Sequence, residues 1–282
     1  MEYDTTKADR LGEEKPGLSA FLFCKGGIVS MTEGLVHSLE SMGLVDGPGI
    51  RTVVFLQGCA LRCQYCHNPD TWQREHPAAE PMTPAQLLRR LERFRPYYGE
   101  NGGVTFSGGE PLLQPDFLAE SLKLCRRAGI HTCLDTAGCG LGDYGKILAH
   151  TDLVLLDVKH HTPEGFRQVT GGDMEPFCRF VEAVREAKVP LWVCHVVVPG
   201  LTDGKEHLEG LEEYLRTLPR VERVELLPYH TLGVHKYEAL GIAYPLEGVP
   251  PMEAGALSAW NERLNRRCVR AEREERKMDD EY

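Results

Sequence analysis

The sequence has no apolar run near the roughly 18 consecutive residues that a membrane-spanning helix requires. The nearest approach to a secretory signal is the short apolar stretch 18–24. It follows the acidic pair Glu13 and Glu14, where a signal would carry positive charge. These absences predict a protein of the cytoplasm.

Positive charge is also scarce in this chain. There are 32 Lys and Arg residues against 42 Asp and Glu residues, which gives a net charge of −10 at pH 7. This deficit argues against nonspecific binding to nucleic acid or to an anionic membrane. We therefore expect neither as a partner, and an acidic small molecule would need a local basic pocket.

Disulfides are not expected among the ten cysteines, because the cytosol is reducing. Seven cysteines are scattered singly, as small buried apolar residues would be. The other three, Cys59, Cys63 and Cys66, fall within eight residues. This clustering is the informative feature of the cysteine pattern.

The middle of the chain alternates strand-like and helical patterns, which predicts an α/β fold. Apolar runs typical of strands lie at 51–56, 103–106, 131–134, 153–156, 191–198 and 223–227. Helical patterns separate them; the clearest opens with the capping box Thr83-Pro84-Ala85-Gln86. Strands that are each followed by a helix indicate a parallel sheet with right-handed crossovers.

Unusual polar residues stand directly after each predicted strand. They are Gly58-Cys59, Ser107-Gly108-Gly109-Glu110, Asp135-Thr136, Asp157-Val158-Lys159, Pro199-Gly200 and Pro228-Tyr229-His230. In a βα barrel all such loops face one mouth, whereas a doubly wound sheet gathers them only at its switch point. The pattern favours a barrel.

The cysteines form a C-x3-C-x2-C loop after the first predicted strand. Three thiolates leave one iron of a four-iron cubane open, and S-adenosylmethionine can chelate it through its amino and carboxylate groups. Three other interpretations stay open at this point. Cys63-Gln64-Tyr65-Cys66-His67 fits the haem c attachment pattern, the three cysteines with His67 could bind zinc, and the thiols could simply be buried.

The other strand-end residues are weaker signals. The glycines of Ser107-Gly108-Gly109-Glu110 would let the backbone approach a ligand, although glycine pairs usually mark turns. Asp135, Thr136 and Asp157 could bind a small cation or could act as helix N-caps. Lys159 could oppose a cofactor carboxylate and His230 could contact an adenosyl group, or each could be solvated or structural.

Several ordered motifs around these residues carry a resemblance to a known family. They are Asp46-Gly47-Pro48-Gly49-Ile50-Arg51, Gln57-Gly58-Cys59, Tyr65-Cys66-His67-Asn68, Ser107-Gly108-Gly109-Glu110, Leu134-Asp135-Thr136, Leu156-Asp157-Val158-Lys159 and Leu227-Pro228-Tyr229-His230. From about residue 34 to residue 266 the chain closely resembles the pyruvate formate-lyase activating enzymes of the radical S-adenosylmethionine superfamily.

The resemblance implies a partial (β/α)6 barrel, open on one side, in which Cys59, Cys63 and Cys66 bind a [4Fe-4S] cluster. It also implies that S-adenosylmethionine is surrounded by Tyr65, Cys66, His67, Gly109, Asp157, Val158, Lys159 and His230. Asp135, Thr136 and Asp157, with the carbonyl of Leu155, would hold a monovalent cation. Asp46 would lie near the glycine loop of the substrate protein.

The implied activity is anaerobic activation of pyruvate formate-lyase (formate C-acetyltransferase). Reduced flavodoxin or a similar donor supplies one electron, S-adenosylmethionine is cleaved to methionine and a 5′-deoxyadenosyl radical, and the radical takes hydrogen from a glycine. Some relatives that activate other glycyl-radical enzymes carry a cysteine-rich insert; residues 67–106 contain no cysteine, which favours the pyruvate formate-lyase type. An activase of another glycyl-radical enzyme is the alternative. We expect a monomer.

Two features depart from the family pattern. Residues 1–30 precede the matched region and predict a disordered leader, with the barrel domain at 31–266 and a charged tail at 267–282. Cys194 stands where the family has an arginine that contacts the cofactor. Either the basic residues Lys159 and His195 compensate for it, or the cofactor is held less tightly.

Overall fold

The computed structural model describes residues 21–24, 27–30, 32–253 and 255–279. The chain divides into two units, Met1–Thr32 and Glu33–Tyr282. In the first unit, β1 (Phe21–Cys24) pairs antiparallel with β2 (Gly27–Ser30). Residues 1–20, 25 and 26 of the predicted leader lie outside the described residues.

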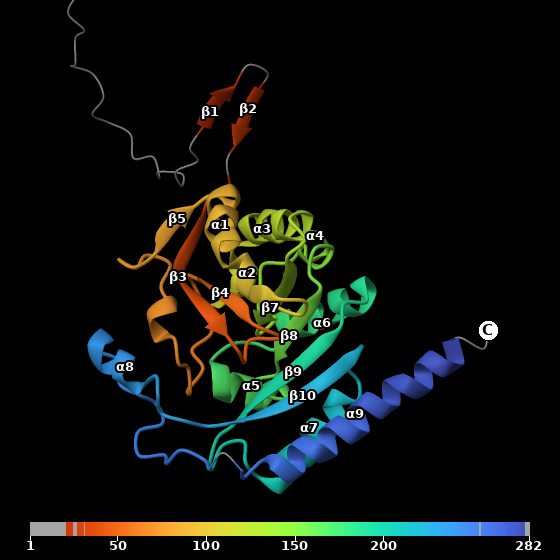
Figure 1. Cartoon of the computed structure of the whole chain (residues 1–282). Helices are drawn as coiled ribbons and strands as arrows, with labels where there is room; N and C mark the ends of the chain where they lie inside the picture. Colours follow the sequence, from red (N-terminus) through yellow and green to blue (C-terminus); the bar gives the residue numbers. More distant parts are fainter. Residues whose placement is uncertain (1–20, 25–26, 31, 254, 280–282) are drawn as a thin grey trace, which may run out of the picture. The chain divides into compact units, whose positions relative to one another are not determined.

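The second unit is built on one eight-stranded sheet that does not close (Figure 1). Its strand order is β10-β9-β8-β7-β6-β4-β3-β5. Six strands run parallel: β4 (Arg51–Leu56), β6 (Gly103–Gly108), β7 (His131–Thr136), β8 (Leu153–Asp157), β9 (Leu191–Val197) and β10 (Val221–Pro228). They confirm the six predicted strands and the partial, open barrel.

Two further strands extend the sheet beyond β4. The antiparallel strand β3 (Gly34–Gly43) pairs with β4, and the short β5 (Glu80–Met82) pairs antiparallel with β3. Neither was predicted. Only the first half of β3 is well buried, so its sequence lacks the sustained apolar pattern of the parallel strands.

Helices follow the strands as predicted. They are α1 (Pro84–Leu91), α2 (Arg95–Tyr98), α3 (Pro115–Arg127), α4 (Gly145–Leu148), α5 (Pro163–Thr170), α6 (Glu175–Ala187), α7 (Lys205–Leu215), α8 (Val234–Leu240) and α9 (Ser258–Asp279), with 3-10 turns at Pro69–Thr71, Glu92–Phe94 and Pro111–Leu113. The capping box of α1 is confirmed: Gln86 N donates to Thr83 Oγ1, and Thr83 N donates to Gln86 Oε1. No helix in the described part of the chain has the length and apolar character to span a membrane.

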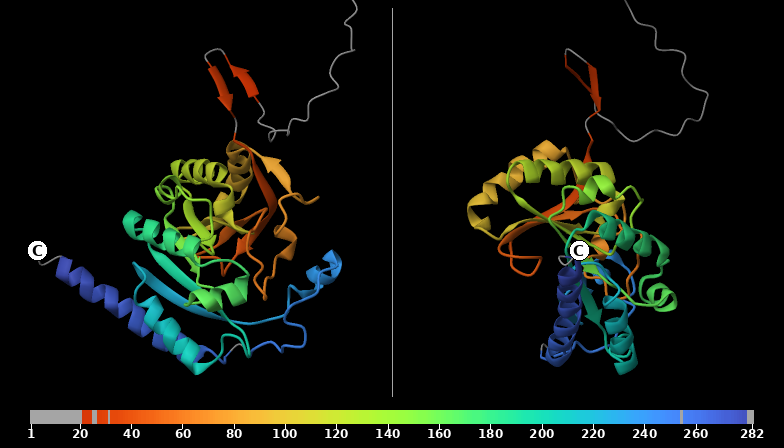
Figure 2. Two further views of the ribbon diagram at one scale, coloured as in Figure 1. Left: turned by 180° about the vertical axis from the view of Figure 1, so that it is seen from behind. Right: turned by 90° about the vertical axis from the view of Figure 1, so that its right-hand side faces the viewer.

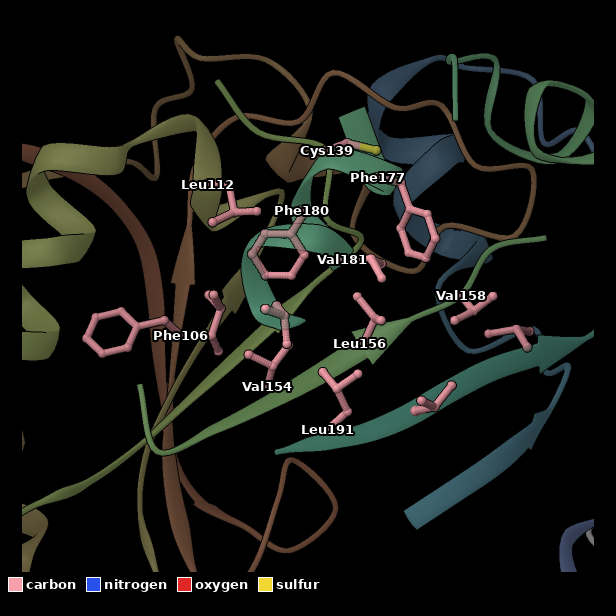
Figure 3. Close-up of a cluster of buried hydrophobic side chains, with 14 of the residues drawn as sticks. Phe106, Leu112, Cys139, Val154, Leu156, Val158, Phe177, Phe180, Val181 and Leu191 are labelled. Carbon is pink, nitrogen blue, oxygen red and sulfur yellow. The ribbon is translucent and has the colours of Figure 1, made fainter. Parts of the chain in front are cut away.

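The main core lies between the sheet and its covering helices (Figure 3). Phe177, Phe180 and Val181 of α6 lie against Val154 and Leu156 of β8, and all five are buried. Complete burial of an aromatic or aliphatic side chain contributes about 1.5–3 kcal/mol.

The inner face of the sheet has a much smaller core of Cys133, Leu153 and Leu155, with Trp192 packed against it. Because side chains alternate along a strand, the next inward positions toward the carboxyl ends are Asp135, Asp157 and Cys194. Asp135 is in register with Leu155, and Asp157 with Cys194. The inner face therefore changes from apolar to polar toward the mouth.

Helix α9 completes the free edge of β10. Asn265 accepts from Val224 N and donates to Val224 O, and Asn261 does the same for Leu226. Figure 2 shows α9 beside α7 at this edge, where Arg263 and Arg267 pair with the buried Glu212 of α7. The side chains of Asn261 and Asn265 thus satisfy backbone groups that the edge strand β10 would otherwise expose.

Candidate active site

The cysteine loop, residues 58–66, follows β4 and is held on two sides by backbone hydrogen bonds. Gly58 N donates to Thr71 O at 2.7 Å and Cys59 N to Trp72 O at 3.1 Å. On the other side, Arg62 N donates to Thr170 O at 2.8 Å, at the end of α5. Gly58 has φ 104°, in the region that favours glycine. The loop is thus positioned by main-chain contacts on both sides, and the side chain of Gln64 adds a hydrogen bond to Gln168 O at 2.7 Å.

The three thiols of this loop have little contact with water. Cys63 is buried, and Cys59 and Cys66 are half-buried. Burial raises the pKa of Cys59 and of Cys63 to about 12, and it also raises that of Cys66. Thiolates here require a positively charged partner, which a bound metal supplies.

A single zinc ion is not the best fit to the loop. In the described part of the chain, the one group of three His, Cys, Asp or Glu side chains close enough to share an ion is elsewhere, and it contains none of the loop cysteines. Ligands of tetrahedral zinc lie within about 3.8 Å of one another, as follows from Zn–S bonds near 2.3 Å. A four-iron cluster accepts thiolates spaced more widely.

The glycine loop, residues 107–110, lies directly against the cysteine loop. Gly109 N donates to Leu56 O at 2.9 Å, and Glu110 N donates to Gly58 O at 2.8 Å. A Cβ atom on Gly109 would stand 2.2 Å from Gly58 O. The close approach that the glycines permit is therefore to the backbone of the cysteine loop.

Glu110 connects the glycine loop to the end of β7, a role that its place in the Ser107-Gly108-Gly109-Glu110 motif does not reveal. It is buried and accepts hydrogen bonds from Thr136 Oγ1 at 2.5 Å, Ala137 N at 3.0 Å and Leu112 N at 3.1 Å. Burial raises its pKa. The hydroxyl of Thr136 donates to Glu110 and accepts from Gly138 N at 2.9 Å, so one lone pair of Thr136 Oγ1 is left for a cation.

Asp135 and Asp157 lie near each other at the ends of the adjacent strands β7 and β8, as predicted. Ser107 Oγ donates to Asp135 at 2.5 Å. The pKa of Asp135 is raised to about 7, mainly by burial and to a smaller extent by the charge of Asp157.

Asp157 has one satisfied and one orphaned oxygen. Oδ2 pairs with Lys159, while Oδ1 is buried and has no hydrogen-bond partner among the described residues. A buried carboxylate oxygen without a partner is costly, so it indicates a site for a ligand. A cation or the cofactor would satisfy it.

The remaining cofactor residues fall into two arrangements. Tyr65 is buried, its hydroxyl has no partner in the described structure, and Lys159 Nζ lies 5.3 Å from its ring centroid. His67 stacks on His230 with ring centroids 4.0 Å apart and donates through Nε2 to His230 O at 3.2 Å. Burial lowers the pKa of His67 to about 4.

The side chain of Val158 does not face this site. It is fully buried in the helix-side core, so only its backbone can contribute (Figure 3). Val158 N donates to Cys194 O at 2.9 Å. Its carbonyl accepts from His195 Nδ1 at 2.6 Å, so the second lone pair of this carbonyl is what the backbone of Val158 can offer to a cofactor.

Cys194 and His195 point to opposite faces of β9. Burial, and then the charges of Asp157 and Asp135, raise the pKa of Cys194, which places this thiol with the inner carboxylates. His195 is fully buried and contacts His207 of α7. His195 therefore cannot replace the family's arginine, and that expectation is wrong. Lys159 is the basic residue near Cys194.

Asp46 lies in the β3–β4 loop, at the opposite end of β4 from the cysteines. Its carbonyl accepts from Thr105 Oγ1 at 2.6 Å, and its charge contributes to the raised pKa of Asp135. Arg51, which sequence reasoning did not single out, is fully buried and donates to Thr105 Oγ1 and to the carbonyls of Pro48 and Val104. It fixes this loop against β6.

Comparison with known proteins decides the family. Residues 53–214 match the model of the Radical SAM superfamily. A pyruvate formate-lyase-activating enzyme of Clostridium pasteurianum is 54% identical over 224 residues, 79% of this chain and 93% of that protein. One of Streptococcus mutans is 48% identical over 225 residues, 77% of this chain and 86% of that protein. The chain belongs to the pyruvate formate-lyase-activating enzymes.

Solved structures support the fold of this activating enzyme. Streptococcus suis SuiB bound to precursor peptide SuiA has a TM-score of 0.59 at 17% identity, covering 84% of this chain and 48% of that chain. SuiB bound to S-adenosylmethionine has a TM-score of 0.54 at 18% identity, covering 73% and 44%. At these identities the likeness shows the radical SAM fold alone.

The cofactors of the activating enzyme are those of its superfamily, a [4Fe-4S] cluster and S-adenosylmethionine. The described residues fit both. Three buried or half-buried thiols share one clamped loop, and the orphaned polar atoms Asp157 Oδ1 and Tyr65 Oη flank Lys159 next to them. Such unpaired groups at a mouth are satisfied by a polar ligand.

Proposed function

We propose that this chain activates pyruvate formate-lyase under anaerobic conditions by forming a radical on one of its glycines. The observation that supports it most is the clamped three-thiol loop against the glycine loop, in a chain of this family. The comparisons name pyruvate formate-lyase for the relatives. We carry that substrate over to this chain because the match covers most of both proteins.

Cys59, Cys63 and Cys66 hold the [4Fe-4S] cluster in this proposal. When bound, the reduced cluster and S-adenosylmethionine supply a 5′-deoxyadenosyl radical, which takes hydrogen from the substrate glycine. The protein's own part is to exclude water and to orient. Burial of Cys63 and the main-chain clamps on residues 58–64 keep the thiol loop dry and fixed.

Charged and aromatic groups around the loop orient S-adenosylmethionine. The Lys159 ammonium opposes its carboxylate, and Tyr65 and the His67–His230 stack provide apolar and aromatic surfaces. Gly109 lets the glycine loop lie directly against the cysteine loop beside the cofactor. Cys66 and the backbone of Val158 complete the set. Positioning of this kind removes part of the entropic barrier to reaction.

We further propose that Asp135, Thr136 and Asp157, with the carbonyl of Leu155, hold a monovalent cation. The orphaned Asp157 Oδ1 and the raised pKa of Asp135 support it, because a cation would let both carboxylates stay ionised. Asp157→Asn should keep the iron content and slow S-adenosylmethionine cleavage roughly tenfold, the size typical of losing an orienting group.

The measurement for the cation is 5′-deoxyadenosine formation in a series of monovalent salts at constant ionic strength. Asp143→Asn is the matched control, because that carboxylate is exposed and pairs with Lys146. Rates that depend on the cation for the parent and not for Asp157→Asn support the site. Equal rates for the parent in every salt, including an organic cation too large to enter, refute it.

Three finer features belong to the proposal. Flavodoxin or a similar protein donates the electron, the enzyme acts as a monomer, and it works in the cytoplasm. The nine cysteines from Cys59 to Cys268 are free thiols, which suits a reducing compartment. Asp46, whose charge reaches Asp135 from the other end of β4, contacts the incoming glycine loop.

The test is anaerobic incubation of the reconstituted protein with pyruvate formate-lyase, S-adenosylmethionine and a chemical reductant. We expect a glycyl-radical signal by electron paramagnetic resonance, and none from a lyase whose radical-bearing glycine is replaced by alanine. A signal with another glycyl-radical enzyme but not with pyruvate formate-lyase would change the partner. No signal with either, at full iron content, would refute the activity.

A further inference from the structure

Three histidines gather at a place that the proposed function does not use. His160 and His161 follow β8 and the cofactor residue Lys159, and His207 lies near the start of α7. One ring nitrogen from each lies within 4.8 Å of the other two. All three side chains are half-buried.

The surrounding helices leave room for these rings only because they carry glycine. A Cβ atom on Gly165 of α5 would stand 2.1 Å from His160 Cε1, and one on Gly210 of α7 would stand 2.5 Å from His161 Nε2. The rings of His160 and His161 are stacked, with centroids 4.8 Å apart. The cluster is thus closely packed between two helices.

Hydrogen bonds fix where the protons of this cluster lie. The carbonyl of Val158 can only accept, so His195 Nδ1, 2.6 Å away, carries a proton. Neutral His195 then has its lone pair on Nε2, which accepts from His207 Nε2 at 3.1 Å. It follows that His207 keeps its lone pair on Nδ1.

The other two rings also offer a lone pair. His160 Nδ1 accepts from Thr162 N at 3.0 Å and lies 3.3 Å from Thr162 Oγ1, so a metal at this nitrogen would have to displace Thr162. His161 Nδ1 is buried and has no hydrogen-bond partner in the described part of the chain. An unpaired buried nitrogen in a histidine cluster points to a missing ligand.

The rings are neutral, which is the form that binds metals. Burial, and then the neighbouring histidines, lower the pKa of His207 to about 3, and burial and His161 lower that of His160 to about 4. Burial also lowers the pKa of His161, against the charge of Glu213. Protons therefore do not compete for these nitrogens near neutral pH.

We propose that His160, His161 and His207 form a binding site for a divalent transition-metal ion, on the helix-covered side of the sheet. Imidazole nitrogens suit Zn²⁺, Ni²⁺ and Cu²⁺, and three of them leave a fourth position for water. The chain from His207 through His195 to the Val158 carbonyl is the supporting shell that ligating histidines usually have. The ion would thereby stiffen the backbone between Asp157 and Lys159, next to the proposed cofactor site.

Zinc binding to the cluster-loaded, tag-free full chain tests the proposal. After dialysis against a chelator, calorimetric titration with ZnCl₂ should show one zinc per chain with no loss of iron. His161→Ala and His207→Ala should each weaken this binding at least about tenfold. His235→Ala is the matched control, because that histidine is exposed on α8, and it should bind zinc like the parent.

A second measurement keeps the proposal testable if a histidine variant fails to fold. In ¹⁵N-histidine spectra of the parent, zinc should shift His207 Nδ1 and His161 Nδ1, with His195 Nδ1 remaining protonated. The site would be overturned if the cluster-loaded parent bound no zinc, or if the parent and a folded His161→Ala protein bound equal amounts of zinc. Zinc-induced shifts confined to other histidines would also overturn it. Because iron content is read independently, this outcome is separate from failure of the proposed function.

Discussion

The two faces of the curved sheet differ in the side chains that their strands carry. On the helix side, Leu156 of β8 is fully buried and packs with the apolar residues of α6. On the inner side, two strand positions beyond the apolar Leu155, Asp157 has a buried carboxylate oxygen with no hydrogen-bond partner in the described structure. The apolar helix side therefore supplies the stability of the fold, and the inner side can keep polar groups that only a bound ligand would satisfy.

The largest effect should come from Cys63→Ala on the inner side. Loss of one of three thiolates should reduce the iron content from about four per chain to near zero and abolish glycyl-radical formation. Iron analysis after anaerobic reconstitution measures this. Cys125→Ala is the matched control, a buried thiol of α3 that should leave iron unchanged. Normal iron and activity in Cys63→Ala would break the assignment of the loop.

The next effect should come from Phe180→Ala on the helix side. Removing this buried ring leaves a cavity, so the free energy of unfolding should fall by about 3–5 kcal/mol. Denaturant unfolding of the iron-free protein measures it, and the folded fraction should still take up iron. Tyr97→Ala, an exposed aromatic change, should shift stability by no more than about 0.5 kcal/mol. Equal losses for both variants would contradict the described core.

Gly109→Ala should sharpen the comparison, because it alters only the contact between two inner loops. Its Cβ would stand 2.2 Å from Gly58 O, so the two loops must separate. We expect S-adenosylmethionine cleavage to fall by roughly tenfold or more, with a smaller loss of stability. Gly145→Ala has open space around its Cβ and serves as control. Unchanged cleavage in Gly109→Ala would show that the close approach has no role in positioning.

The smallest effect should come from Asn265→Ala in α9. This side chain forms two hydrogen bonds to Val224 at the free edge of β10, and its loss should cost about 1–2 kcal/mol of unfolding free energy. Iron content should not change. Exposed Glu262→Ala on the same helix is the control. A loss of iron in Asn265→Ala would show that the edge and the site are coupled.

Much of the fold was predictable because parallel strands are buried on both faces. The runs at 53–56 and 153–156 are continuously apolar, so their composition alone indicates β4 and β8. β3 was missed because half of it is poorly buried, and β5 because it has three residues. The edge cap by Asn261 and Asn265 has no local signal, since it requires α9 to pack along β10.

The residues of the candidate site were likewise predictable only in part. Cys59, Cys63 and Cys66 were identifiable because their spacing fits one cluster, and Asp135 and Asp157 because each ends a strand. The buried Arg51 and the histidine cluster were not identified, because their partners are distant in sequence: Arg51 reaches Thr105, and His207 reaches His160 and His195.

By itself, the sequence determined the thiol spacing, the strand pattern and thereby the family, because these depend on residues close together in the chain. Tertiary structure alone decided which way each side chain points and which buried atoms lack a partner. Val158 and His195 show this most clearly: both stand beside site residues in sequence, yet strand alternation directs their side chains to the helix side. The orphaned oxygen of Asp157 likewise exists only because folding removes it from water.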